Sequence, residues 1–298
     1  MLISDNNTRW NSVYKSITRA IQLQAKISVF SETHRKEMGR FSLLQEDWDV
    51  LKWLAQSLEV FWTQTQRLQG KAKFGHHGAI WEALPAMEYL FQHLEQLKLR
   101  TPQSEPRLWE CVNNAWSKMT KYYELTDKSH QIYAAATFLN PTQRRDFFDD
   151  SWVGKLQPWI EVMLANCRDH WERDYAHLAP HKKIKKRDAF EEWLYRKKED
   201  DTGDEFRRYS IAGSAIPATE KFDPIAWWSQ PDIEEAFPTL QRWALDIFAC
   251  PATSCECERA FSSVKKLITP ERNSLGDDII EALECLRAWW NNGLIKRL

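Results

Sequence analysis

Apolar side chains recur every three or four residues along much of this 298-residue chain. Such spacing is typical of amphipathic α-helices that bury one face. Nine glycines in the whole chain leave few positions for tight turns, and no hairpin dipeptide separates alternating apolar runs. We therefore expect a mostly α-helical fold. The longest run, from Leu43 to Leu68, places these residues on one face: Leu44, Trp48, Leu51, Leu54, Ala55, Leu58, Phe61 and Trp62.

Three further segments, 79–98, 107–124 and 152–174, repeat the helical spacing. Pro85 falls inside the first of them, where a proline either kinks a helix or lies in its first turn.

A change of composition between Arg196 and Glu220 divides the chain. Charges of both signs are followed there by small residues and a proline, which is typical of an exposed, mobile linker. We therefore expect a helical body over 1–195, a flexible linker over 196–220 and a C-terminal module over 221–298.

The overall charge argues against a domain that binds nucleic acid over its whole surface. With 41 basic and 42 acidic side chains the net charge is −1, whereas domains that bind nucleic acid over their whole surface concentrate Lys and Arg. The one concentrated basic run, His181–Arg187, either contacts phosphates, serves as a nuclear-import signal or forms a solvated helix face, and we favour the last reading. No apolar stretch is long enough to cross a membrane.

The cysteines indicate reduced thiols, because the six of them show no disulfide-framework spacing. Cys250, Cys255 and Cys257 invite a zinc hypothesis. However, their C-x-C spacing is unusual for structural zinc and no histidine lies nearby, so we expect no metal site.

The C-terminal module reads as three helices. Pro238 begins the first, Ser254 caps the second, and Asp277 or Asp278 begins the third. The third helix is short and terminal and carries a broad apolar stripe, and such a surface needs a partner element or a second chain to cover it. The stripe of the third helix consists of Ile279, Ile280, Leu283, Leu286, Trp289 and Trp290.

Several motifs follow one another in a specific order. In the module these are Trp227-Trp228, Pro238-x-Leu240, Pro251-Ala252-Thr253-Ser254, Glu258-Arg259-Ala260-Phe261-Ser262, Thr269, Arg272 and Leu275. Upstream, residues 7–12 read NTRWNS and residues 132–141 read IYAAATFLNP. In this order the motifs resemble the C-terminal portion of hAT-family DNA transposases. The module resembles the family's C-terminal dimerisation region.

The resemblance implies that the body is an insertion-type helical domain and that the last helices belong to an incomplete RNase H-like fold. In that family two aspartates and a glutamate hold two divalent metals such as Mg²⁺ and cleave DNA. The glutamate corresponds to Glu258, and both aspartates precede the TRWNS element. This sequence begins nine residues before Trp10. We therefore expect the aspartates to be missing, the chain to be no enzyme as it stands, and Mg²⁺ to bind only if they are supplied.

The resemblance also assigns DNA-handling roles to Arg9 and Trp10, although packing is the simpler role for Trp10 here. Glu258, taken alone, is a favourable charge near a helix N-terminus. The residues expected to carry dimerisation are Phe261, Leu283, Leu286, Trp289 and Trp290.

These observations predict a transposon-derived protein with dimerisation activity, a homodimer or hetero-oligomer, without catalysis of its own. One alternative is a fragment of an active hAT transposase that cleaves and joins DNA. The other is a domesticated DNA-binding regulator. We expect the protein in the nucleus, with the cytoplasm as the alternative.

Overall fold

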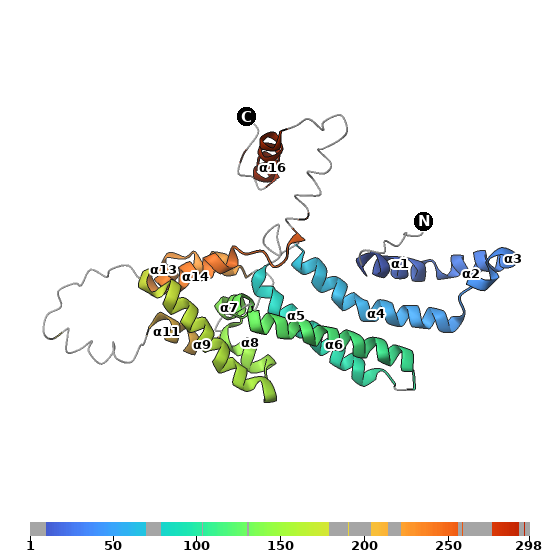
Figure 1. Ribbon diagram of the computed structural model, residues 1–298, viewed down its shortest axis with the longest axis horizontal. Helices are drawn as coiled ribbons and strands as arrows, with labels where there is room; N and C mark the ends of the chain where they lie inside the picture. The colour runs from blue at the N-terminus through green and yellow to red at the C-terminus, as the bar shows by residue number, and fades with distance from the viewer. Residues whose placement is uncertain are drawn as a thin grey trace.

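A computed structural model describes residues 10–69, 79–102, 104–129, 131–178, 190, 204–213, 222–255, 258, 276–291 and 295. Most of these residues lie in α-helices or short 3-10 helices, which confirms the mostly helical prediction (Figure 1). Within the described ranges, the single β contact is an isolated antiparallel bridge between Ala79 and Pro251. The RNase H-like assignment stays a prediction.

The first helices form an N-terminal arm (Trp10–Leu68) at one end of the molecule (Figure 1). Helix α1 lies beside α4, where the rings of Tyr14 and Trp62 stack at 5.6 Å and the Lys15 ammonium lies 4.8 Å from the Trp62 ring. The long helix predicted from Leu43 to Leu68 is confirmed as α4. The arm contains α1 (Trp10–Gln22), α2 (Gln24–Thr33), α3 (Arg35–Met38), η1 (Gly39–Phe41) and α4 (Gln45–Leu68).

A second helical pair follows, formed by α5 (Ala83–Arg100) and α6 (Pro106–Ser129) after the short η2 (Ile80–Glu82). Pro85 lies in the first turn of α5, so it does not kink the helix. The ring of Trp116 on α6 lies 5.9 Å from that of Phe91, and the Lys98 ammonium lies 4.3 Å from the Trp116 ring. These contacts join the two helices through aromatic surface.

The remaining helices build a central core. Helix α7 supplies its middle, where Ala135, Ala136, Phe138 and Leu139 are fully buried. The alanines allow neighbouring helices to approach α7 closely, because a methyl group takes little space. The helix predicted within 152–174, with its start near Pro158, is confirmed as α9, and the short η3 precedes it. The core elements are α7 (Gln131–Leu139), α8 (Arg144–Ser151), η3 (Gly154–Leu156), α9 (Gln157–Asp174), η4 (Ala176–Leu178), α11 (Glu205–Ile211), α12 (Pro224–Trp228), α13 (Pro231–Ala236) and α14 (Pro238–Phe248).

The linker predicted over 196–220 is wrong for residues 205–211. This stretch forms α11, and its Phe206 and Tyr209 are buried to 4% and 0% exposure. The charges around it suggested solvent, but two aromatic residues three positions apart place one face of a short helix in the core. The other residues of that prediction lie outside the described ranges, apart from Asp204, Ala212 and Gly213.

The buried core also crosses the boundary expected between body and module. Trp228, Leu240 and Trp243 from the module pack in one cluster with Phe138 and Trp171 from the body. The proposed division into body, linker and module stays a prediction, but its two larger parts share this core. No helix among the described residues has the length and apolar character needed to cross a bilayer.

Candidate self-association surface

Helix α16 (Asp277–Asn291) lies apart from the core helices in Figure 1. This confirms the third helix predicted for the C-terminal module. Asp277 and Asp278 occupy its first turn, where negative charge is favoured by the helix dipole. No other described helix packs extensively against α16.

One face of α16 is apolar and open. Its residues at positions 279, 283, 286 and 290 follow spacings of four, three and four, which is the seam spacing of two packed helices. Their exposed fractions lie between 41% and 49%. No described residue therefore covers this apolar face of α16, which we name the α16 stripe. The α16 stripe consists of Ile279, Leu283, Leu286, Trp289 and Trp290.

The dimerisation residues predicted from the sequence divide into two groups. Leu283, Leu286, Trp289 and Trp290 lie together on the open face of α16. Phe261 lies outside the described residues.

The residues predicted to handle DNA or metal are not brought together in the described part of the chain. Glu258 is an exposed residue whose backbone N–H donates to the Ser254 carbonyl at 3.0 Å. Trp10 begins α1 and is 41% exposed, so it is not a buried packing residue in this chain. Arg9 and the basic run 181–187 lie outside the described residues. Among those residues, no group of three or more His, Cys, Asp or Glu side chains could hold a metal ion.

The alanine-rich landmark ends at a carbonyl that joins three parts of the chain. The Leu139 carbonyl accepts hydrogen bonds from the Tyr209 hydroxyl at 2.9 Å and from the Trp228 indole N–H at 2.8 Å. The Trp228 carbonyl in turn accepts from the Gln241 side-chain amide at 2.7 Å. Because these groups are buried, each bond satisfies a polar atom that water cannot reach. The bonds therefore fix α11 and α12 against α7.

Arg144 makes further contacts at the same junction. Its side chain is buried, its guanidinium donates to the Ala212 carbonyl at 3.0 Å, and the group lies 4.4 Å from the Tyr209 ring. The backbone φ of Arg144 is 47°, which lies in the left-handed region that residues other than glycine seldom adopt. Burial raises the pKa of the Tyr209 hydroxyl, although the nearby Arg144 guanidinium opposes this shift. That hydroxyl therefore stays a hydrogen-bond donor at neutral pH.

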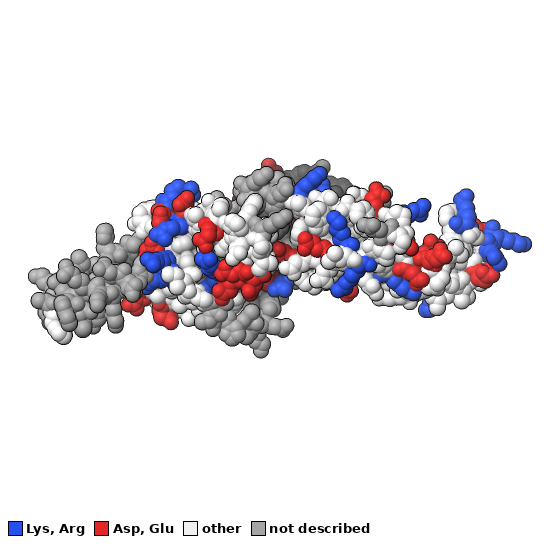
Figure 2. All heavy atoms as spheres, turned by 90° about the horizontal axis from the view of Figure 1, so that it is seen from below, with Lys and Arg blue, Asp and Glu red and all other residues white. Residues whose placement is uncertain are grey.

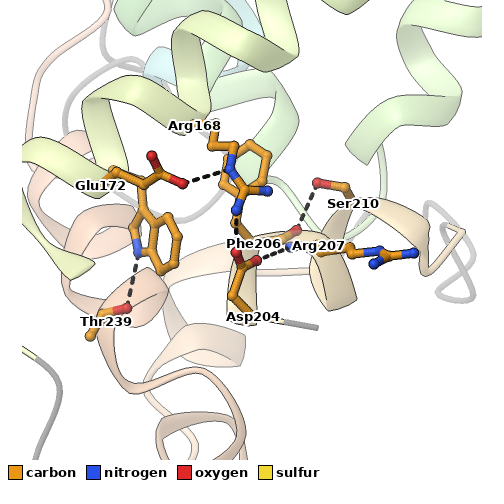
Figure 3. A network of polar contacts seen from close by, with 8 residues as sticks. Arg168, Glu172, Asp204, Phe206, Arg207, Ser210 and Thr239 are labelled. Carbon is orange, nitrogen blue, oxygen red and sulfur yellow. Dashed lines mark hydrogen bonds and ion pairs between the residues drawn. The ribbon is translucent and has the colours of Figure 1, made fainter. Parts of the chain in front are cut away.

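A network of polar contacts holds α11 between α9 and α14 (Figure 3). Arg168 on α9 pairs with Glu172 at 2.6 Å and also with Asp204. Asp204 caps α11 by accepting the Arg207 N–H at 2.8 Å. This is the geometry that an N-terminal Asp gives a helix.

Glu205 then caps a second helix from outside it. Its carboxylate accepts from the Thr239 N–H at 3.0 Å, from the Thr239 hydroxyl at 2.9 Å and from the Leu240 N–H at 3.1 Å. The Thr239 hydroxyl also accepts the Trp171 indole N–H at 2.9 Å. A carboxylate at the N-terminus of α14 is favoured by the helix dipole. These contacts hold the start of α14 in place, whereas the apolar face of α16 stays open.

Sequence reasoning missed Arg144, Glu205 and Tyr209. A signal existed for the last two, since Asp204 stands at a helix-capping position just before a segment with aromatic residues three apart. Nothing in the sequence marks Arg144 as a buried cation, because its contacts come from residues about 65 positions away.

Comparison with known proteins adds a family similarity for the C-terminal part of the chain. Residues 205–290 match the hAT family C-terminal dimerisation region. That match begins at α11 and ends on α16, so it includes Glu205, which caps α14, and the α16 stripe.

Relatives extend the similarity upstream. An AC transposase of Zea mays is 21% identical over 96% of this chain and 36% of its own length. A transcriptional regulator of Talaromyces stipitatus, tpeD, is 25% identical over 94% of the chain and 31% of its length. An AC9 transposase of Zea mays is 31% identical over 58% of the chain and 22% of its length. The chain thus spans at most 36% of the length of these relatives. Residues 205–290 are therefore similar to the C-terminal dimerisation region of the hAT family, within a sequence that is similar to AC transposases over most of its length.

Proposed function

We propose that this chain is a transposon-derived protein whose function is self-association, and that the α16 stripe forms the contact. The observation that carries this proposal is the open apolar seam of α16 inside the segment that matches a dimerisation region. Leu and Trp side chains that stay about half exposed in one chain gain free energy when a second surface covers them. Tryptophans are also frequent among the residues that dominate binding energy.

Substitution at the seam tests this proposal. Leu286→Lys together with Trp290→Lys removes two apolar contacts and introduces two charges into the interface. We expect the dimer dissociation constant to rise at least about 30-fold, since each such anchor contributes more than about 1 kcal/mol. Light scattering over a concentration series measures this. Leu99→Lys is the matched control, because Leu99 is 86% exposed and lies on α5, away from the seam.

We also propose that this 298-residue polypeptide does not cleave DNA on its own. Two-metal cleavage requires several carboxylates that converge on one point, and Glu258 is the one carboxylate of this sequence at a family catalytic position. A purified chain incubated with DNA and Mg²⁺ is expected to leave the DNA intact. Nicking or joining that disappears in Glu258→Gln would contradict this and favour the alternative of an active transposase.

A second candidate function is regulation of transcription through DNA binding in the nucleus. The observation that favours it is the similarity to the regulator tpeD over 94% of the chain. It predicts salt-sensitive binding to duplex DNA, because contacts to phosphates release counterions. Absence of binding to any duplex at low salt would remove this candidate.

A further inference from the structure

The two ends of the described chain carry opposite charge. Helix α16 has four carboxylates, Asp277, Asp278, Glu281 and Glu284, against Arg287 alone. Residues 10–44, which include α1, α2 and α3, have six cations against the two carboxylates of Glu32 and Glu37. Figure 2 shows Lys and Arg gathered at the end of the molecule formed by α2 and α3. The six cations are Lys15, Arg19, Lys26, Arg35, Lys36 and Arg40.

Helix α2 presents an open face of its own. Val29 is 68% exposed and Phe30 is 52% exposed, and no residue of α2 is buried. The Phe30 ring stacks on His34 at 4.2 Å, which holds it along the helix. A shallow groove runs along this face, which we name the α2 face. Its lining residues are Ala25, Lys26, Val29, Phe30, Thr33 and His34.

Charge decides which surface best covers the α16 stripe. Two α16 helices packed on each other place two strongly acidic helices about 8–10 Å apart, where like charges repel. The α2 face combines exposed apolar side chains with neighbouring cations. An acidic α16 that packs on this face is therefore attracted by opposite charge, whereas two α16 helices repel each other. Opposite charge also raises the rate of encounter and fixes the orientation of two partners.

The lengths of the two surfaces agree as well. The stripe from Ile279 to Trp290 spans about 16 Å and the α2 face from Ala25 to His34 about 14 Å, at 1.5 Å per residue. Resting on the self-association proposed above, we propose that the α16 stripe of one copy docks on the α2 face of a second copy. The carboxylates of Asp277, Asp278 and Glu281 then lie near the cations of α2 and α3. Two such contacts, related by a two-fold axis, close a symmetric dimer.

A disulfide trap distinguishes this contact from pairing of two α16 helices. The background replaces every cysteine by serine except Cys167, whose buried thiol has its pKa raised to about 12 by desolvation and is therefore unreactive. A chain with Val29→Cys is mixed with a differently tagged chain with Leu286→Cys and oxidised gently. We expect a covalent dimer that contains both tags. Val153→Cys, at another exposed valine far along the chain, is the matched control and is expected to give none.

The possible outcomes separate the two proposals. Cross-linking of Leu286→Cys chains to one another, without the mixed product, overturns docking on α2 and leaves self-association standing. A further variant carries Val29→Cys and Leu286→Cys in the same chain. If its two cysteines link within one chain and the singly substituted chains give no mixed dimer, docking between two copies is overturned. A chain that scatters light as a monomer at every concentration contradicts both proposals.

Charge reversal gives a second test that does not depend on cysteine chemistry. Lys26→Glu is expected to raise the dimer dissociation constant several-fold, and the effect is expected to shrink at high salt because salt screens exposed charges. Glu281→Lys in the same chain is expected to restore much of the affinity. An unchanged or lowered dissociation constant for Lys26→Glu would contradict the docking.

Discussion

The central core buries many aromatic residues, whereas in the N-terminal arm only α4 buries one among the described residues, Trp48. Trp171, Trp228 and Trp243 in the core are at most 5% exposed, whereas α1 and α2 in the arm contain no buried residue. The core also satisfies the indole N–H groups of Trp171 and Trp228 with specific acceptors. An apolar face in the sequence therefore identifies a helix, but it does not say whether the same chain covers that face.

This contrast assigns different tasks to the two regions. The core fixes α11 and α14, in the first part of the segment that matches the dimerisation region, through the Leu139 carbonyl and the Glu205 carboxylate. The arm and α16 keep apolar surface open, and such surface on a folded chain marks an interaction site. Stability is therefore expected to depend on the core, and association on the open helices.

The largest expected effect sharpens the comparison between buried and open tryptophans. Trp228→Ala removes a fully buried ring and one donor to the Leu139 carbonyl. We expect the free energy of unfolding to fall by about 3–5 kcal/mol in urea denaturation. Trp62→Ala in the arm, where the ring is partly exposed, is the matched control and is expected to cost clearly less. Equal losses would contradict the division into core and arm.

A smaller effect compares two helix caps. Glu205→Ala removes three hydrogen bonds at the start of α14, so we expect a loss of about 1–2 kcal/mol in the free energy of unfolding. Asp47→Ala removes the exposed bond from the Leu44 N–H to the Asp47 carboxylate at the start of α4, and a smaller loss is expected. Measured by the same denaturation, the order of the two losses should not reverse.

The smallest effect concerns pH. Burial against the Trp243 ring lowers the pKa of His170, although Asp174 at 3.3 Å opposes this shift. Below about pH 6.5, the ordinary value, the unfolded chain therefore binds more protons at this site than the folded chain does. The contribution of His170 to the free energy of unfolding is therefore fully present above about pH 6.5, and it is lost as the pH falls towards the lowered pKa of the folded chain. In His170→Gln we expect the free energy of unfolding to change less with pH below about pH 6.5. An unchanged pH dependence in this variant would contradict the role of His170.

The sequence predicted local structure better than long-range contacts. Helices such as α4, α14 and α16 were predictable, because each shows periodic apolar residues and a recognisable start. The buried state of α11 was not predictable in the same way. Its charged neighbours suggested solvent, while Phe206 and Tyr209 pack against α7 and α9, which come from distant parts of the chain.

The candidate site shows the same limit. The stripe on α16 follows from helical spacing alone, and its five residues are all exposed in the structure. The α2 face could not be predicted, since the sequence does not show which side of α2 is left open by α1 and η1. Its role depends on charge from α3 as well as on its own side chains.

The central claim is that two copies of this chain associate through α16, and the mass of the unmodified protein as a function of concentration tests it most directly. Multi-angle light scattering from nanomolar to high micromolar protein is predicted to show the mass rising from that of one 35.3 kDa chain to that of two. A constant mass of one chain up to the highest concentration would contradict the account.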